Sequence, residues 1–102
     1  MREIIRQIAQ VINENFNPEK VILFGSYAYG KPTAESDIDI FVIMDTKLRF
    51  SEQATEIRMK IREKIKDKPP IDLLVRTQES IKKRIEMNDF FIKEIIEKGV
   101  VL

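Results

Sequence analysis

Hydrophobic and polar residues alternate along the chain with two different periods, and the changes of period predict an order of helices and strands. Apolar residues recur every three or four positions in residues 2–15 and again in 51–66, which is typical of amphipathic helices. Shorter apolar runs at 20–24, 37–44 and 71–75 have the length and the β-branched content of strands. The pattern therefore predicts a chain in which helices and strands alternate.

Residues that start or stop helices mark the boundaries of these segments. Asn17 and Pro18 end the first helix, and Pro69 and Pro70 follow the second. Ser51 is the expected N-cap of the second helix, because its hydroxyl can accept a hydrogen bond from a free backbone N–H in the first turn. These boundaries leave the third strand directly after the two prolines.

The C-terminal quarter of the chain predicts two further helices. Thr77 is expected to start a helix through about residue 86, and Asn88 is expected to cap another through about residue 97, with Gly99 as its stop. Core packing is the expected role of seven apolar residues on the predicted helices: Ile57, Ile61, Ile65, Phe91, Ile92, Ile95 and Ile96.

Composition narrows the class of protein. With 102 residues, of which 43% are apolar, the chain is expected to form one compact domain over residues 1–102. Eighteen basic and seventeen acidic residues nearly cancel, which argues against direct binding to nucleic acid through net charge. No apolar run approaches the ~20 residues of a membrane span, and no signal-peptide pattern opens the sequence, so we expect a cytoplasmic protein without membrane association.

The chain contains neither cysteine nor histidine. This excludes disulfides, thiolate zinc sites, cysteine nucleophiles and catalysis by an imidazole base. Proton transfer and metal binding, if the protein performs them, therefore fall to carboxylates.

The segment GSYAYGKP at residues 25–32 nearly matches the phosphate-binding P-loop. Gly25, Gly30 and Lys31 fit the pattern G-x-x-x-x-G-K-[ST]. Pro32 stands where the P-loop carries a hydroxyl that binds Mg²⁺, and no long amphipathic helix follows it. The P-loop is therefore disfavoured, a loop is expected after the Gly-Ser turn, and the two glycines need another explanation.

Two aspartates, Asp37 and Asp39, occur at the start of the strand 37–44. Because side chains alternate along a strand, both project to the same face. Neighbouring carboxylates repel each other unless a cation compensates, and Mg²⁺ is typically held by one or two carboxylates together with substrate phosphates. The same residues also fit a simpler role, as polar side chains at the solvent-exposed entrance of a strand.

A third carboxylate, Asp72, interrupts the apolar strand 71–75. If this strand lies beside 37–44, Asp72 can complete a cluster able to hold two Mg²⁺ ions about 3.5–4 Å apart, as in phosphoryl and nucleotidyl transfer. Gly25 would then let a phosphate approach the backbone closely, while Ser26 and the following amides hydrogen-bond it. Taken alone, Gly25 also fits an ordinary tight turn.

Together these residues resemble the nucleotidyltransferase motif of the DNA polymerase β-like superfamily. The motif consists of Gly25 and Ser26, ten intervening residues, Asp37-x-Asp39, and Asp72 on a later strand. The length and the GSYAYG segment most resemble the minimal nucleotidyltransferase (MNT) domain proteins, a group that includes the antitoxins paired with HEPN toxins. The resemblance covers roughly residues 4 to 102.

The resemblance implies an α/β (α+β) fold, with helices packed on a mixed β-sheet. It also implies a nucleotidyltransferase that uses Mg²⁺, two ions being expected, and ATP or another NTP. The transferred group would be an NMP, AMP above all, and the acceptor a hydroxyl of a protein. Gly25 and Ser26 would bind the triphosphate, and Asp37, Asp39 and Asp72 would bind the metal, with Asp72 also acting as the base. The implied partner is a HEPN-type toxin. The protein would form either a homo-oligomer or a hetero-oligomer.

The sequence departs from the family pattern at one position. Many relatives read GSxARG, and Tyr29 stands where that arginine would be, so a cation near the site is either missing or supplied by Lys31. A chain this short leaves little room for a part that reads the acceptor, which favours a large acceptor that docks beside the site. Residues 77–97 offer a surface for docking, because only one of the neighbours Phe90 and Phe91 can point squarely inward.

Two hypotheses about function follow from the sequence. The first is a Mg²⁺-dependent nucleotidyltransferase that modifies a protein hydroxyl. The second is a binding module, an antitoxin-like subunit that neutralises its partner by contact while its nucleotide site is vestigial. The presence of all three carboxylates favours the enzyme.

Overall fold

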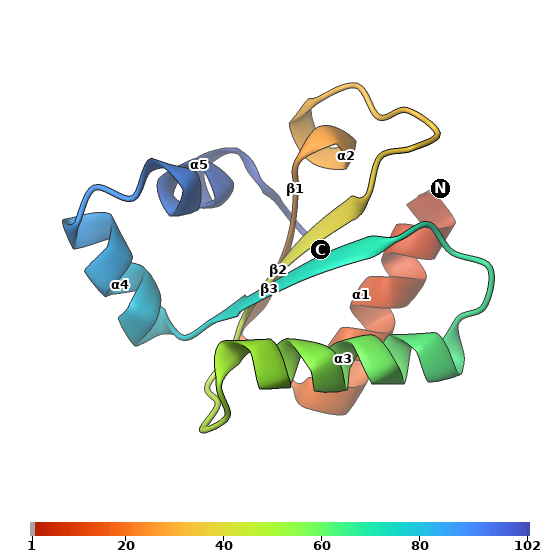
Figure 1. Cartoon of the computed structure of the whole chain (residues 1–102), viewed down its shortest axis with the longest axis horizontal. Coiled ribbons are helices and arrows are strands. Elements are labelled where there is room, and N and C mark those ends of the chain that lie inside the picture. Colours follow the sequence, from red (N-terminus) through yellow and green to blue (C-terminus); the bar gives the residue numbers. More distant parts are fainter. Residues whose placement is uncertain (1) are drawn as a thin grey trace.

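The computed structural model describes residues 2–102, in which helices and strands alternate as the sequence predicts (Figure 1). Within this part of the chain the strands are β1 (Lys20–Phe24), β2 (Ile38–Ile43), β3 (Ile71–Arg76) and β4 (Val100–Val101). The helices are α1 (Arg2–Phe16), α2 (Ser26–Tyr29), α3 (Phe50–Lys64), α4 (Gln78–Glu86) and α5 (Phe90–Lys98). None of these helices has both the length and the apolar character needed to cross a bilayer.

The strands form one mixed sheet in the order β3-β2-β1-β4. Strand β1 pairs antiparallel with both β2 and β4, whereas β2 pairs parallel with β3. A parallel pair needs a long crossover connection, and the segment that contains α3 supplies it. The mixed sheet with packed helices that the family resemblance implies is therefore confirmed.

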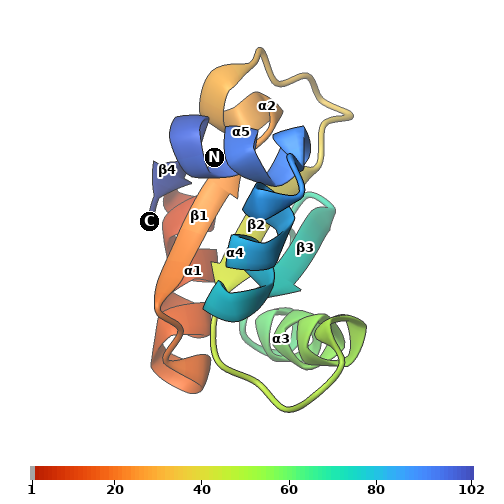
Figure 2. The ribbon, with the colours of Figure 1, turned by 90° about the vertical axis from the view of Figure 1, so that its left-hand side faces the viewer.

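Helices cover both faces of the sheet, with α1 and α3 on one face and α4 and α5 on the other (Figures 1 and 2). The alternation of side chains along β2 explains how one strand serves both layers. Ile38 and Ile40 pack in the cluster that includes α1 and α3. Phe41 and Ile43 pack in the cluster that includes α4 and α5. Strand β2 is therefore the centre of the hydrophobic core.

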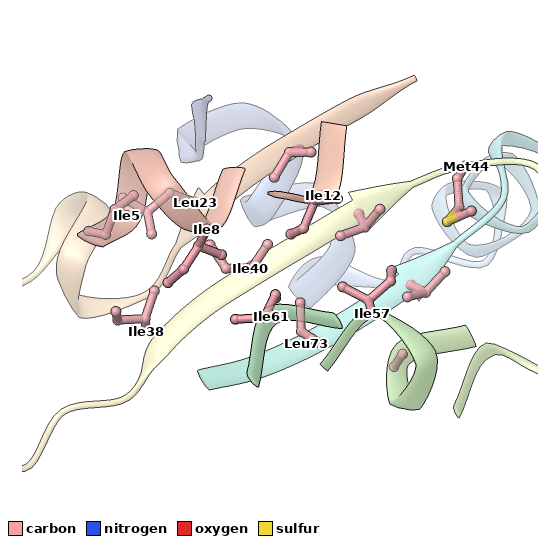
Figure 3. Packing of buried hydrophobic residues seen from close by; sticks show 14 of the residues in the cluster. Ile5, Ile8, Ile12, Leu23, Ile38, Ile40, Met44, Ile57, Ile61 and Leu73 are labelled. Carbon is pink, nitrogen blue, oxygen red and sulfur yellow. The ribbon is translucent and has the colours of Figure 1, made fainter. Parts of the chain in front are cut away.

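The larger core lies between the sheet and the helices α1 and α3 (Figure 3). Ile8 and Ile12 of α1 and Ile57 and Ile61 of α3 are fully buried there, as their helical spacing predicts. Truncating one such side chain to alanine removes buried apolar surface and leaves a cavity, at a typical cost of about 2–5 kcal/mol. This layer fixes the positions of β1, β2 and β3.

Two predicted helix caps are wrong by one or two residues. Helix α3 begins earlier than expected, with Arg49 rather than Ser51 as N-cap, because the Glu52 carboxylate accepts a hydrogen bond from the Arg49 backbone N–H at 3.2 Å. Helix α5 is capped by Asp89 rather than Asn88, and the Asp89 carboxylate accepts from the backbone N–H of Ile92 at 3.1 Å. The expected caps at Thr77 and Gly99 are confirmed.

Two of the predicted core residues are exposed. Phe91 is 52% and Ile96 is 41% exposed, whereas the other five are buried. The inner stripe of α5 consists of Ile92 and Ile95, and a short helix that covers one strip of the sheet leaves the flanking positions in solvent. Phe90 is 76% exposed, so both neighbouring phenylalanines lie outside the core.

Candidate active site

Parallel pairing of β2 with β3 places Asp39 opposite Asp72. Neighbouring strands lie about 4.8 Å apart and residues in register project to one face, so the two carboxylates are side by side. Asp37 comes two positions earlier, directly before β2 begins. The backbone N–H of Ile38 donates to the carbonyl oxygen of Pro70 at 2.9 Å, which joins the starts of the two strands. The adjacency that a shared acidic site requires is therefore present.

Gly25 lies against the carboxylate of Asp39. Phe24, the last residue of β1, is paired with Asp39 across the sheet, so the turn at Gly25 follows beside that carboxylate. Gly25 has φ 72° and ψ −155°, a conformation that favours glycine, and a Cβ at this position would overlap the Oδ2 atom of Asp39. A tight turn alone would account for the backbone angles, but the contact ties this glycine to the acidic site.

The predicted loop after the Gly25-Ser26 turn begins with a short helix, α2. The backbone N–H groups of Ala28 and Tyr29 both donate to the carbonyl oxygen of Gly25 at 3.0 Å. Gly30 caps the C-terminal end of α2, where a Cβ would lie 2.9 Å from the Cα of Ser26. Both glycines of the near P-loop sequence thus allow close approaches around this one turn.

Negative charge accumulates at the three aspartates. The pKa of Asp39 is raised above its ordinary value of 3.8, first by burial and then by the charges of Asp72 and Asp37. Within residues 2–102, none of the ion pairs involves these aspartates. Tyr29 and Lys31, at and near the position of the arginine common in relatives, are both exposed. The donor set of three hard oxygen ligands without a cation suits Mg²⁺.

The three side chains do not converge as they stand. Over the described part of the chain, no group of three or more carboxylates is arranged so that it could hold a metal ion. Strand register fixes the backbone positions of Asp39 and Asp72, but Asp37 and Asp72 are exposed and can rotate about their side-chain bonds. The backbone positions of the three aspartates therefore fit a metal site, whereas their side-chain rotamers do not.

The aspartates stand at an open end of the sheet. Grooves along α4, between α1 and β4, and beside α3 are lined by residues other than the three aspartates. Asp37 and Asp72 are exposed, so this end of the sheet is open to solvent.

Sequence reasoning missed one feature near the aspartates. The ring of Phe24 contacts the rings of Phe41 and Phe91 edge to face, and Phe24 is paired with Asp39. Phe24 and Phe91 are far apart in the sequence, and helical periodicity indicates only that Phe91 is apolar. No signal in the sequence joins this residue to the acidic site.

Comparison with known proteins places the chain in a family. The profile of the nucleotidyltransferase domain family matches residues 5–102. A protein of Methanocaldococcus jannaschii named "Putative protein adenylyltransferase" is 34% identical over 85 residues, which cover 82% of this chain and 77% of that protein. A second protein of the same name and organism is 42% identical over 45 residues, which cover 44% of this chain and 45% of that relative.

A solved structure has the same fold. The crystal structure titled as that of a "putative nucleotidyltransferase" from Sulfolobus solfataricus matches 99% of this chain and 78% of its own with a TM-score of 0.64, at 19% sequence identity. The similarity extends over β1, β2, β3 and the helices around the three aspartates, because almost the whole chain is covered. The match of the family profile to residues 5–102 and the relative aligned over 82% of the sequence lead to one conclusion, that this chain belongs to the nucleotidyltransferase domain family.

Proposed function

We propose that this protein is a Mg²⁺-dependent nucleotidyltransferase that moves AMP from ATP to a hydroxyl group of another protein. The observation that carries the proposal is the alignment of Asp39 with Asp72, beside a Gly25 that no larger residue can replace without displacing the Asp39 carboxylate. The names of the relatives support AMP as the transferred group and a protein as the acceptor. Asp37 and Asp72 are exposed, and this open position supports a large acceptor, since a small ligand usually binds in an enclosed, concave site.

Each residue of the site has a proposed role. Asp37, Asp39 and Asp72 would hold Mg²⁺, two ions in the complete site, which would neutralise the phosphates and polarise the reacting phosphorus. The backbone at Gly25 and the hydroxyl of Ser26 would bind the triphosphate. The Asp72 carboxylate would accept the proton of the acceptor hydroxyl. The hydroxyl oxygen would then form a bond to the α-phosphorus of ATP. The bond between the α-phosphorus and the oxygen that bridges it to the β-phosphate would break, and pyrophosphate would leave.

The proposed acceptor is a HEPN-type toxin, as the resemblance to MNT antitoxins implies. AMP carries a bulky group and a negative charge, so its addition near the active site of such a toxin would oppose RNA binding there. The reaction would take place in the cytoplasm, where ATP is available. On this proposal the chain is an antitoxin that acts by covalent modification and forms a hetero-oligomer with its acceptor during transfer.

A second function is favoured by two observations. Because no three carboxylates of the described chain stand ready to hold a metal, and Tyr29 replaces the arginine common in relatives, the site also fits a subunit that has lost catalysis. Such a protein would neutralise its partner by contact. The enzyme remains the better proposal, since a vestigial site has no need to keep Gly25 against Asp39.

Two measurements decide between these functions. Calorimetry with ATP, GTP, CTP and UTP should show binding in the presence of Mg²⁺ and much weaker binding without it, because the phosphates supply part of the metal's ligands. Intact-mass spectrometry of a HEPN-type protein that co-purifies with this chain should show a gain of one or more AMP units after incubation with ATP and Mg²⁺. Tight complex formation without any gain of mass would leave neutralisation by contact.

A matched variant controls both measurements. Asp45 is an exposed aspartate that follows β2 at the end away from the site. Asp45→Asn removes the same charge from the protein as Asp39→Asn does. Nucleotide binding and transfer should survive the first change and be lost with the second. Equal losses in both variants would mean that the effect is not specific to the site at Asp39.

A further inference from the structure

We propose that the exposed ring of Phe91 is the platform on which the nucleobase of the bound nucleotide stacks. This inference rests on the proposed function, because it assigns a further contact to the same nucleotide. It concerns the chemistry of the base, an aromatic plane, and not the triphosphate or the metal. The observations that carry it are a chain of aromatic contacts and the position of that chain beside Asp39.

Three phenylalanines lead from the core to the surface. Phe41 is fully buried and contacts Phe24 edge to face, with 6.5 Å between ring centroids and an angle of 83° between the ring planes. Phe24 contacts Phe91 in the same way, at 5.9 Å and 81°. Phe91 is half exposed. Its ring is therefore held by the core on one side and offers apolar surface to solvent on another.

The aromatic chain lies beside the acidic site. Phe24 is paired with Asp39 across β1 and β2, and such cross-strand neighbours have Cβ atoms about 4.5–5.5 Å apart. The next residue along β1 is Gly25, the proposed contact of the triphosphate. Phe91 thus contacts the residue that is paired with Asp39, and α5 crosses the same face of the sheet (Figure 2).

Stacking explains the exposure of Phe91 better than core packing does. Helix α5 buries Ile92 and Ile95 against the sheet, so the contact of Phe91 with Phe24 is not needed to hold the helix in place. Every nucleobase has an apolar face, so a ring at this place adds affinity without choosing strongly among bases. Purines, which have the larger rings, should bind somewhat better than pyrimidines.

The neighbour Phe90 provides a matched control. It has the same side chain and lies in the same first turn of α5, but it is 76% exposed and makes no ring contact among the described aromatic residues. Replacing Phe90 removes an exposed phenylalanine without touching the aromatic chain. A difference in ATP affinity between the Phe91 and Phe90 variants would therefore reflect the position of the ring, not the loss of apolar surface.

The test compares ATP with inorganic tripolyphosphate, which has the phosphates and lacks the base. Calorimetry in the presence of Mg²⁺ would be carried out on the wild type and on Phe91→Ala, Phe91→Leu, Phe91→Tyr and Phe90→Ala, with the fold checked by circular dichroism. Loss of stacking should weaken ATP binding by about 5- to 100-fold in Phe91→Ala and Phe91→Leu. Tripolyphosphate binding should not change, and Phe91→Tyr and Phe90→Ala should bind ATP like the wild type.

The results that overturn the inference differ from those that overturn the proposed function. Unchanged ATP affinity in Phe91→Ala and Phe91→Leu, with wild-type protein that binds ATP, would remove the stacking role and leave the enzyme standing. Equal weakening of ATP and tripolyphosphate would show that the ring supports the fold of the site and not the base. Wild-type protein that binds neither compound would overturn the nucleotide site itself, and the stacking role with it.

Discussion

The Asp39 carboxylate occupies the place where any residue other than glycine at position 25 would carry its Cβ. The turn after β1 and the start of β2 are therefore sterically complementary at this point. Burial and the nearby charges of Asp72 and Asp37 raise the pKa of this carboxyl group. A carboxylate held in such a place without a cation costs folding energy, which is expected of a residue retained for chemistry and not for stability.

Gly25→Ala should destabilise the protein and disrupt the site. The backbone at Gly25 has φ 72°, which alanine adopts only with strain of about 1–3 kcal/mol, and the new Cβ would push the Asp39 side chain away. Thermal unfolding should show the loss of stability, and calorimetry should show that Mg²⁺-dependent ATP binding is lost. In a double-mutant cycle, Asp39→Ala should relieve part of the strain. Strictly additive losses would mean that the two residues do not interact.

Asp39→Asn should leave the metal-free protein equally stable or more stable at neutral pH. The pKa of Asp39 is raised in the folded state above 3.8, so the folded protein holds this proton more tightly than the unfolded chain does. Ionisation of Asp39 therefore lowers the free energy of unfolding as the pH rises from about 3.8 through the raised pKa of the folded state. The advantage of the variant should appear over that interval and vanish at lower pH.

Urea unfolding of the wild type and Asp39→Asn at a series of pH values measures this difference. Asp45→Asn serves as the control, since Asp45 is exposed beyond the other end of β2. A large loss of stability in Asp39→Asn at neutral pH would instead show that the carboxylate is a structural residue of the strand.

Asp72→Asn should separate nucleotide binding from transfer. Asp72 is exposed, and Asp37 and Asp39 remain to bind a metal ion with the phosphates, so ATP binding should weaken only modestly. Loss of a general base typically lowers a rate by about 10²- to 10⁴-fold. The initial rate of AMP addition to the acceptor, measured by intact mass, should fall accordingly. An unchanged rate would assign the base to another residue.

Asp89→Ala should connect the cap of α5 with nucleotide affinity. Asp89 accepts a hydrogen bond from Ile92 and lies 3.8 Å from Arg84, so its loss should destabilise the protein by about 1 kcal/mol and loosen the turn that carries Phe91. Thr77→Ala removes the equivalent cap of α4, where Thr77 accepts from a backbone N–H at 3.1 Å, and should cost about as much stability. Calorimetry should show weaker ATP binding for Asp89→Ala alone.

The amino-acid sequence determines the order of the main elements of this protein. Helical spacing in α1 and α3 and short β-branched runs in β1, β2 and β3 are local patterns, and local patterns can be read without knowing the contacts. The spacing of Gly25, Ser26, Asp37 and Asp39 is also local, and together with Asp72 in a later apolar run it indicated the family. Errors at the caps of α3 and α5 are small, because neighbouring residues compete for the same free N–H groups.

Tertiary structure decided which distant residues meet. Asp72 joins Asp39 only because β3 pairs parallel with β2 in one particular register, and a shift of one residue would turn Asp72 to the opposite face. Phe91 reaches Phe24 only because α5 folds back over β1. Strand β4 is too short to show a period, and its two residues become a strand by pairing with β1. The sequence specified the chemical groups of the site, while long-range pairing, which no local pattern encodes, set their positions.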